Sequence, residues 1–413
     1  MMTNFTHRAR EISRILWVRA LSIGLLAVLA AVLTPFLGPY VPESISGLVD
    51  KEGVNRVLDS LATALLTVTT FSVSVMVAVR TAATDRWSPR YLALLSNDPV
   101  TQNVLATFIG TYIFSLTAII LSNTGPFSQG GYAIIFALTV FTIVLVIVAI
   151  LRWVSHLQSL GSLAATCRDL ANTISKLLTD KGHDPCWGAN RLDADAIASF
   201  GDNKIDAQWS GYLTSVRLED LQKAAKENGA RIALAVRVGD YIRDGQHIGY
   251  LQGNMETEEI GKFLTFAEAR TFDQDARFAI STLSEIAVKA LSPSVNDPSS
   301  AMDVITWIDS FTSDMDVDDR AQENELKYPD IWLRPTTTMD LFGSSYFAIA
   351  RYAMDHYNVV QLLLRILHHH RKSDTPQISE AASAAYDFVF DAISESKMLE
   401  ADRKALQEEF GNA

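Results

Sequence analysis

Four acidic side chains in the last third of the chain have the spacing of a calcium-binding loop. Asp314, Asp316 and Asp318 alternate along the sequence, and a glutamate, Glu325, follows at the end of the same segment. Oxygen ligands at these intervals hold Ca²⁺ in a helix–loop–helix site. However, Asp319 occupies the position at which such a loop needs glycine for its sharp turn. We therefore interpret this segment as a solvated acidic loop.

Three consecutive histidines are a second candidate for metal chemistry. His368, His369 and His370 are adjacent in the sequence, so a regular helix points them toward different faces. Side chains on different faces cannot bind one metal ion together. We interpret them as the surface end of a helix, where the helix dipole favours cationic groups. The sequence predicts neither a metal site nor a cofactor.

Two carboxylates, Glu285 and Asp297, could act as a pair in a cleft, although their spacing does not require it. Asp297 precedes Pro298, and this dipeptide is typical of a helix start, with the aspartate as cap and the proline in the first turn. The alternative is that Asn296 and Asp297 lie at a subunit contact or a ligand site. The sequence has no G-x-S-x-G, phosphate-binding loop or H-E-x-x-H motif. We therefore predict no catalytic residues and no enzymatic activity.

The strongest functional pattern lies in an apolar stretch, residues 57–80, which read VLDSLATALLTVTTFSVSVMVAVR. This stretch is long enough to cross a bilayer as a helix. Its hydroxyl residues recur at steps of three and four and share one helical face: Ser60, Thr63, Thr67, Thr70 and Ser74. Because lipid offers such a face no hydrogen-bond partner, we expect it to face protein or water. It is either a helix packing interface or the lining of a polar path through an oligomer.

This stretch is one of four apolar segments that predict a membrane domain over residues 1–155. The predicted spans are residues 17–37, 57–80, 104–121 and 132–154. Positive charge is concentrated before the first span and between the second and third, and it recurs at Arg152. The loop between the third and fourth spans has no charge. The positive-inside rule then places both termini in the cytoplasm.

The remainder of the chain is predicted to be an α+β cytoplasmic region with two parts. Residues 156–265 begin with a helical segment toward residue 190, which Asp184-Pro185 and Gly188 break. They continue into strands, because apolar residues alternate from Ile232 to Val238. The run VGDYIRDGQHIGYL, residues 238–251, resembles the barrel-sandwich hybrid of biotinyl and lipoyl carrier domains. No methionine-flanked lysine follows it, so we predict a structural β module. Residues 266–413 are predicted to be mainly helical.

Net charge and cysteine content restrict the possible partners and compartment. The formal net charge is −12, which argues against nucleic acid as a partner because phosphate binding needs a basic surface. The two cysteines, Cys167 and Cys186, do not form a C-x-x-C pair. Two isolated cysteines fit a reducing compartment.

Three motifs indicate a family. They are LSPSVNDPSSA at residues 291–301, SPR at residues 88–90, and FIGTYIFSL in the third predicted span. With them the chain resembles, over nearly its whole length, the predicted bacterial membrane proteins grouped as domain of unknown function twenty-two fifty-four. The resemblance implies four N-terminal spans, a large cytoplasmic region and a multi-pass protein of the bacterial inner membrane. It implies no established activity.

Taken together, the sequence predicts an α-helical membrane domain of four helices joined to an α+β cytoplasmic domain. Its expected partners are the lipid bilayer and further copies of the same chain. The predicted function is a homo-oligomeric channel or transporter in which the second span lines the path. The alternative is a non-catalytic membrane scaffold that assembles through the same hydroxyl face and through the cytoplasmic modules. A membrane-tethered enzyme ranks last, because the sequence has no nucleophile–base or metal-ligand constellation.

Overall fold

The computed structural model describes residues 49–86, 99–124, 128–159, 163–179, 185–201, 203–316 and 326–411, and parts of 22–42. The chain folds into two compact units, Met1–Ser162 and Leu163–Ala413. Part of the first predicted span, the SPR motif and most of the predicted acidic loop lie outside the described residues.

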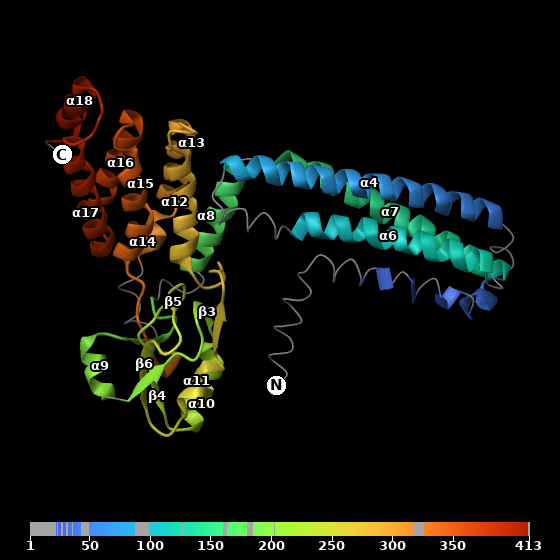
Figure 1. Cartoon of the computed structure of the whole chain (residues 1–413), viewed down its shortest axis with the longest axis horizontal. Helices are drawn as coiled ribbons and strands as arrows, with labels where there is room; N and C mark the ends of the chain where they lie inside the picture. The colour runs from blue at the N-terminus through green and yellow to red at the C-terminus, as the bar shows by residue number, and fades with distance from the viewer. Residues whose placement is uncertain are drawn as a thin grey trace. The chain divides into compact units, whose positions relative to one another are not determined.

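Three long helices form the described core of the first unit (Figure 1): α4 (Lys51–Arg86), α6 (Pro99–Thr124) and α7 (Gln129–Ser159). Helix α6 packs against both of the others. Among the described residues, three segments are long and apolar enough to cross a membrane: Lys51–Val79, Val100–Thr124 and Gln129–Leu157. They coincide with the second, third and fourth predicted spans.

A short 3₁₀ helix, η1 (Gly38–Tyr40), packs against the start of α7. The backbones approach so closely that a Cβ on Gly130 would overlap the carbonyl oxygen of Gly38. Glycine is therefore required at this contact, because any side chain would separate the two segments.

Helices make up one part of the second unit, where they stand side by side (Figure 1). They are α8 (Leu163–Thr179), α12 (Ala276–Ala290), α13 (Pro298–Ser310), η2 (Thr312–Met315), α14 (Thr338–Ser344), α15 (Tyr346–Ala353), α16 (Tyr357–His370), α17 (Pro376–Ile393) and α18 (Glu400–Phe410). Helix α12 is central, since it packs against α8, α13, α14 and α15. Its apolar face is buried along its whole length.

Two sheets make up the other part of this unit. A five-stranded sheet has the order β1 (Ala189–Arg191), β8 (Tyr328–Leu333), β4 (Arg231–Leu234), β6 (His247–Gln252) and β2 (Lys204–Asp206). A three-stranded antiparallel sheet has the order β5 (Tyr241–Ile242), β3 (Gly211–Val216) and β7 (Leu264–Ala267). Three short helices accompany the sheets: α9 (Ala194–Phe200), α10 (Leu218–Glu227) and α11 (Thr257–Gly261).

Strand β8 comes from far along the chain. It follows α13 and η2, yet it pairs in parallel with β1 on one side and with β4 on the other. The sheet therefore draws on segments from both sides of α12 and α13.

The structure corrects two predicted boundaries. The helix predicted from residue 155 toward residue 190, with breaks at Asp184-Pro185 and Gly188, ends earlier, at Thr179. Gly188 has φ +87° and strand β1 begins at Ala189, so the predicted break at Gly188 is confirmed. The strand predicted from Ile232 to Val238 ends at Leu234. Both faces of β4 are buried, since Ile232 and Ala233 each have 0% exposure and belong to different clusters. Its pattern thus reflects burial on two sides, and Val236 and Val238 belong to the following loop.

Candidate functional sites

The predicted hydroxyl face lies exposed along α4. All five of its residues are exposed on the single chain: Ser60, Thr63, Thr67, Thr70 and Ser74. Other positions of α4 form its buried side, including Val54, Leu58 and Leu65. Because the buried side and the hydroxyl face are different faces of the helix, the hydroxyl face is left for lipid, water or another protein.

The hydrogen bonds of this face correct one step of the sequence argument. The Ser60 hydroxyl donates to the Arg56 carbonyl at 2.9 Å, and the Ser74 hydroxyl donates to the Thr70 carbonyl at 2.9 Å. Thr67 donates in the same way to the carbonyl of Thr63 at 3.0 Å. A serine or threonine hydroxyl can donate to the carbonyl one turn earlier in its own helix. Contact with lipid therefore leaves these donors satisfied, and the pattern alone does not exclude it.

A carboxylate on this face indicates more strongly than the hydroxyl groups that the face contacts water or protein and not lipid. Asp59 is exposed beside the hydroxyl residues, and it lines a shallow hollow with Ser60, Thr63, Ala64, Thr67 and Val68. Asp59 lies about 12 Å from the start of α4 by the rise of 1.5 Å per residue. An ionised side chain within an apolar span is costly in lipid and generally faces water or protein. Asp59 therefore favours a polar environment for this face.

The motif around Asn296 and Asp297 forms the turn between α12 and α13. Oδ1 of Asp297 accepts the Ser300 backbone N–H at 3.1 Å, and Oδ2 accepts the Ser300 hydroxyl at 2.6 Å. These two bonds from Ser300 hold the pKa of Asp297 below its ordinary value. The predicted helix cap is therefore confirmed. Asn296 has φ +48°, a left-handed conformation that asparagine tolerates better than most residues.

The three histidines occupy the last turn of α16, and one of them differs from the prediction. His369 is exposed, as expected for a surface helix end. His370 is only 8% exposed, and its Nε2 lies 2.7 Å from Oδ1 of Asp309 on α13. The surface interpretation was wrong for His370, because α16 packs against α13 along this turn.

Of the predicted acidic loop, Asp314 accepts a hydrogen bond from the Ser175 hydroxyl at 2.8 Å.

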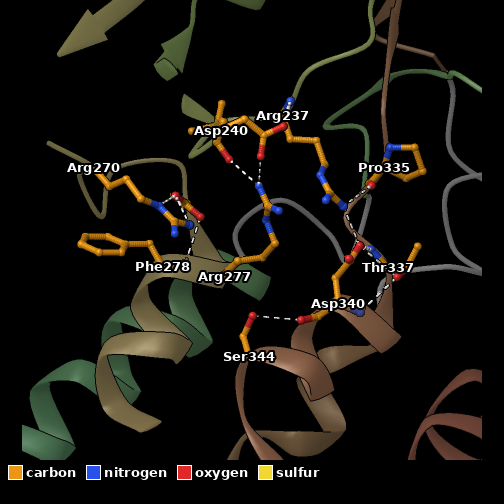
Figure 2. Close-up of polar contacts among 11 residues, drawn as sticks. Arg237, Asp240, Arg270, Arg277, Phe278, Pro335, Thr337, Asp340 and Ser344 are labelled. Carbon is orange, nitrogen blue, oxygen red and sulfur yellow. Dashed lines mark hydrogen bonds and ion pairs between the residues drawn. The ribbon is translucent and has the colours of Figure 1, made fainter. Parts of the chain in front are cut away.

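A cluster of arginines and aspartates, which we call the junction cluster, lies where the sheets meet the helices (Figure 2). Its members are Arg237, Asp240, Arg270, Asp275, Arg277, Arg334 and Asp340. They come from the loop between β4 and β5, the segment that opens α12, the end of β8 and the first turn of α14. None of them was predicted from the sequence to be a site residue.

Three ion pairs organise the junction cluster. Arg237 Nη1 lies 2.6 Å from Oδ2 of Asp340. Arg277 Nη2 lies 3.0 Å from Oδ1 of Asp240 and donates to the Val238 carbonyl at 3.0 Å. These two pairs join segments 103 and 37 residues apart in the sequence.

The third pair is the most deeply buried. Arg270 Nη2 lies 2.7 Å from Oδ2 of Asp275, whose side chain is 2% exposed. Oδ1 of Asp275 also caps α12 by accepting the Phe278 backbone N–H at 3.0 Å. Gly239, with φ +94°, passes so close that a Cβ there would overlap this carboxylate. Glycine is thus needed both for the turn and for the approach of the loop to α12.

Arg237 is a largely buried arginine of the junction cluster that has one unsatisfied donor. Its side chain is 14% exposed, and its Nε is buried without a hydrogen-bond partner among the described residues. Burial, followed by the charge of Arg277, lowers the pKa of Arg237. Partial burial would raise the pKa of Asp340, but hydrogen bonds from Thr337 and the charge of Arg237 lower it below its ordinary value.

A small cavity of about 70 Å³ opens within this junction. Its polar lining includes Arg237, Arg277, Arg334, Gln274 and Thr336. Its apolar lining is provided by Leu177, Leu178, Trp187, Leu333 and Leu341, among others. The cavity thus combines arginine side chains with apolar walls.

Comparison with known proteins identifies the family. Residues 13–369 match the family described as predicted membrane protein DUF2254. The chain belongs to this family. An uncharacterized protein of Mycobacterium bovis, Mb1321c, is 26% identical over 249 residues, which cover 56% of this chain and 46% of the relative. An uncharacterized protein of Mycobacterium tuberculosis, Rv1290c, matches to the same extent.

These relatives are longer than the matched region. The chain spans a little under half the length of the curated relatives that it matches. No solved structure matches the chain. The DUF2254 match includes the hydroxyl face of α4, the α12–α13 turn and the whole junction cluster.

One signal in this DUF2254 sequence could have indicated the junction cluster. The segment RTFDQDAR, residues 270–277, places alternating charges directly before the apolar face of α12. Charges at the entry of a buried helix need partners, so this segment indicated ion pairs. The partners themselves could not be identified, since Asp340 and Arg237 are separated by 103 residues.

Proposed function

We propose that this DUF2254 protein is a homo-oligomeric channel or transporter of the bacterial inner membrane in which α4 lines the path. The observation that supports it is the exposed polar face of α4, which carries Asp59 beside the five hydroxyl residues. A polar face on an apolar span is suited to water or to neighbouring protein. In a ring of identical chains, equivalent faces would surround one axis.

The proposal includes the predicted topology. The chain crosses the membrane four times, with both termini and the second compact unit in the cytoplasm. Residues 1–155 form the membrane domain, residues 156–265 contain a structural β module of barrel-sandwich type, and residues 266–413 contain the helical domain. Asn296 and Asp297 lie on the cytoplasmic side, where their turn is available for a subunit contact.

Solute flux through liposomes containing the purified protein tests the path. The test variant changes Thr63, Thr67 and Thr70 together to valine, which keeps the side-chain shape but removes the hydroxyl groups that hold water. We expect flux to fall at least tenfold while the oligomer, measured by light scattering, remains intact. The control changes Thr107 and Thr117 on α6 to valine, because their hydroxyls make the same kind of bond within their own helix.

Side-chain bulk separates a path from a packing interface. Thr67→Trp should block flux and spare the oligomer if Thr67 faces a water-filled axis. At a tight packing interface the same change should disrupt assembly. A wild-type protein that passes no ion or small solute under any stimulus would instead favour the alternative, a non-catalytic membrane scaffold.

Labelling with a membrane-impermeant thiol reagent tests the topology in intact cells. Asn123→Cys, at the exposed end of α6, should be labelled from outside. Ala401→Cys, exposed on α18, should be labelled only after the cells are opened. The native Cys186 is unsuitable as the internal reporter, because it is 1% exposed and would escape labelling on either side. Labelling of Ala401→Cys from outside would reverse the proposed orientation.

A further inference from the structure

We propose that the cavity in the junction cluster is a binding site for inorganic phosphate or the terminal phosphate of a small ester, held by Arg237, Arg277 and Arg334. This site goes beyond the proposed channel or transporter and does not depend on it. Three observations support the proposal: the balance of charge, the unpartnered donor and the size of the cavity.

The first observation is the balance of charge around the cavity. Four arginines, Arg237, Arg270, Arg277 and Arg334, meet three aspartates, Asp240, Asp275 and Asp340. Each aspartate is paired with one arginine at 3.0 Å or less. Among the described residues, Arg334 forms no ion pair within 4.0 Å, although it lines the cavity. The cluster therefore has one arginine charge more than its carboxylates neutralise.

The second observation is the unpartnered donor of Arg237. Its Nη1 is occupied by Asp340, but its Nε is buried and has no partner among the described residues. A buried donor without a partner costs free energy, and a charged donor costs more. An arginine guanidinium can bind an oxyanion through two parallel N–H groups, so a bound phosphate would supply the missing acceptor.

The third observation is the size and position of the cavity. Its volume of about 70 Å³ compares with roughly 30 Å³ for one water molecule in the liquid. It can hold an ion of a few heavy atoms. Ala276 and Arg277, in the first turn of α12, also line it, so the positive end of that helix dipole favours an anion.

One carboxylate of the lining does not oppose an anion. Asp275 borders the cavity, but its two oxygens are occupied by Arg270 and by the Phe278 backbone N–H. A bound phosphate would contact the β4–β5 loop, the first turn of α12 and the end of β8 at once. It would thereby fasten the sheets to the helices, and its binding would stabilise the unit by mass action.

Equilibrium dialysis of the purified full-length protein with radiolabelled inorganic phosphate tests the proposal, with thermal unfolding measured in parallel. We expect saturable binding of one phosphate per chain and a melting temperature that rises with phosphate, but not with chloride at equal ionic strength. Glycerol phosphate in competition distinguishes the two sources: displacement indicates that an ester enters, and no displacement indicates a site for the free ion. Both results support a phosphate site.

Three variants make the assignment specific. Arg334→Gln removes an exposed arginine without breaking a described ion pair, so the fold should persist while phosphate affinity falls at least fivefold. Arg237→Lys keeps the charge near Asp340 but lacks the planar fork, and its affinity should fall at least tenfold. Arg243→Gln also removes an exposed arginine without breaking a described ion pair, so it is the matched control and should bind as the wild type does. Wild-type affinity in both Arg334→Gln and Arg237→Lys, or wild-type protein without saturable phosphate binding, would overturn the proposal.

Discussion

The hydroxyl face of α4 and the junction cluster satisfy their polar groups in opposite ways. On α4, Ser60, Thr67 and Ser74 each donate to a carbonyl four residues earlier in the same helix. In the junction cluster, Arg237 and Asp340 meet across 103 residues. The local bonds form wherever the helix forms, whereas the distant ones form only when the fold brings their segments together. We therefore expect substitutions to destabilise the junction strongly and the hydroxyl face weakly.

The largest effect should come from Asp275→Ala. This change leaves Arg270 without its partner and removes the cap of α12, so the free energy of unfolding should fall by about 3–5 kcal/mol. Asp275→Asn retains the acceptor for the Phe278 N–H and should lose less. Urea unfolding followed by circular dichroism measures both. Wild-type stability in Asp275→Ala would show that the buried ion pair and the helix cap do not stabilise this junction.

A smaller and pH-dependent effect is expected for Asp340→Asn. The ion pair with Arg237 is lost while an acceptor for Thr337 remains, so stability at pH 7 should fall by about 1–2 kcal/mol. The pKa of Asp340 is lowered in the folded protein. Its contribution is therefore complete above the unfolded value of about 4 and is lost as the pH falls through the folded value.

The pH profile is the decisive measurement for Asp340. Unfolding curves of wild type and Asp340→Asn should differ by a constant amount between pH 7 and about pH 5 and converge below about pH 4. A difference that grows on acidification would have the wrong sign for a lowered carboxylate pKa. It would show that Arg237 does not stabilise the charged form of Asp340.

A local contact of intermediate strength is the Asp297 cap. Asp297→Ala should lower stability by about 1 kcal/mol, and Asp297→Asn or Asp297→Ser should be nearly neutral because each can accept the same bond. Thermal unfolding and liposome flux should be measured together. If Asp297→Asn keeps the melting temperature but abolishes flux, the charge has a role beyond the helix cap.

The smallest effect is expected within α4 itself. The hydroxyl of Ser72 is fully buried and has no hydrogen-bond partner among the described residues. Ser72→Ala removes an unsatisfied polar atom, so stability should stay within about 0.5 kcal/mol of wild type or rise. A loss of more than about 1 kcal/mol in detergent unfolding would show that membrane hydroxyls contribute more than their local bonds suggest.

The sequence predicted those features that depend on neighbouring residues. Continuous apolar runs indicated α4, α6 and α7. The Asp297 cap was predictable because cap and helix are adjacent. His370 and the junction cluster were not, because their environment depends on segments distant in the chain. Asp309 lies 61 residues before His370 and gives no local sign of the contact.

The position of β8 has a consequence for biosynthesis. Strands β1 and β4 are translated well before residues 328–333, and each of them pairs with β8. Until β8 leaves the ribosome, the five-stranded sheet lacks an inner strand, and the facing edges of β1 and β4 have unpaired backbone groups. Such edges are templates for wrong pairing with other chains. A nascent or truncated chain that stops before Tyr328 should therefore be prone to aggregation, although its membrane helices are already complete.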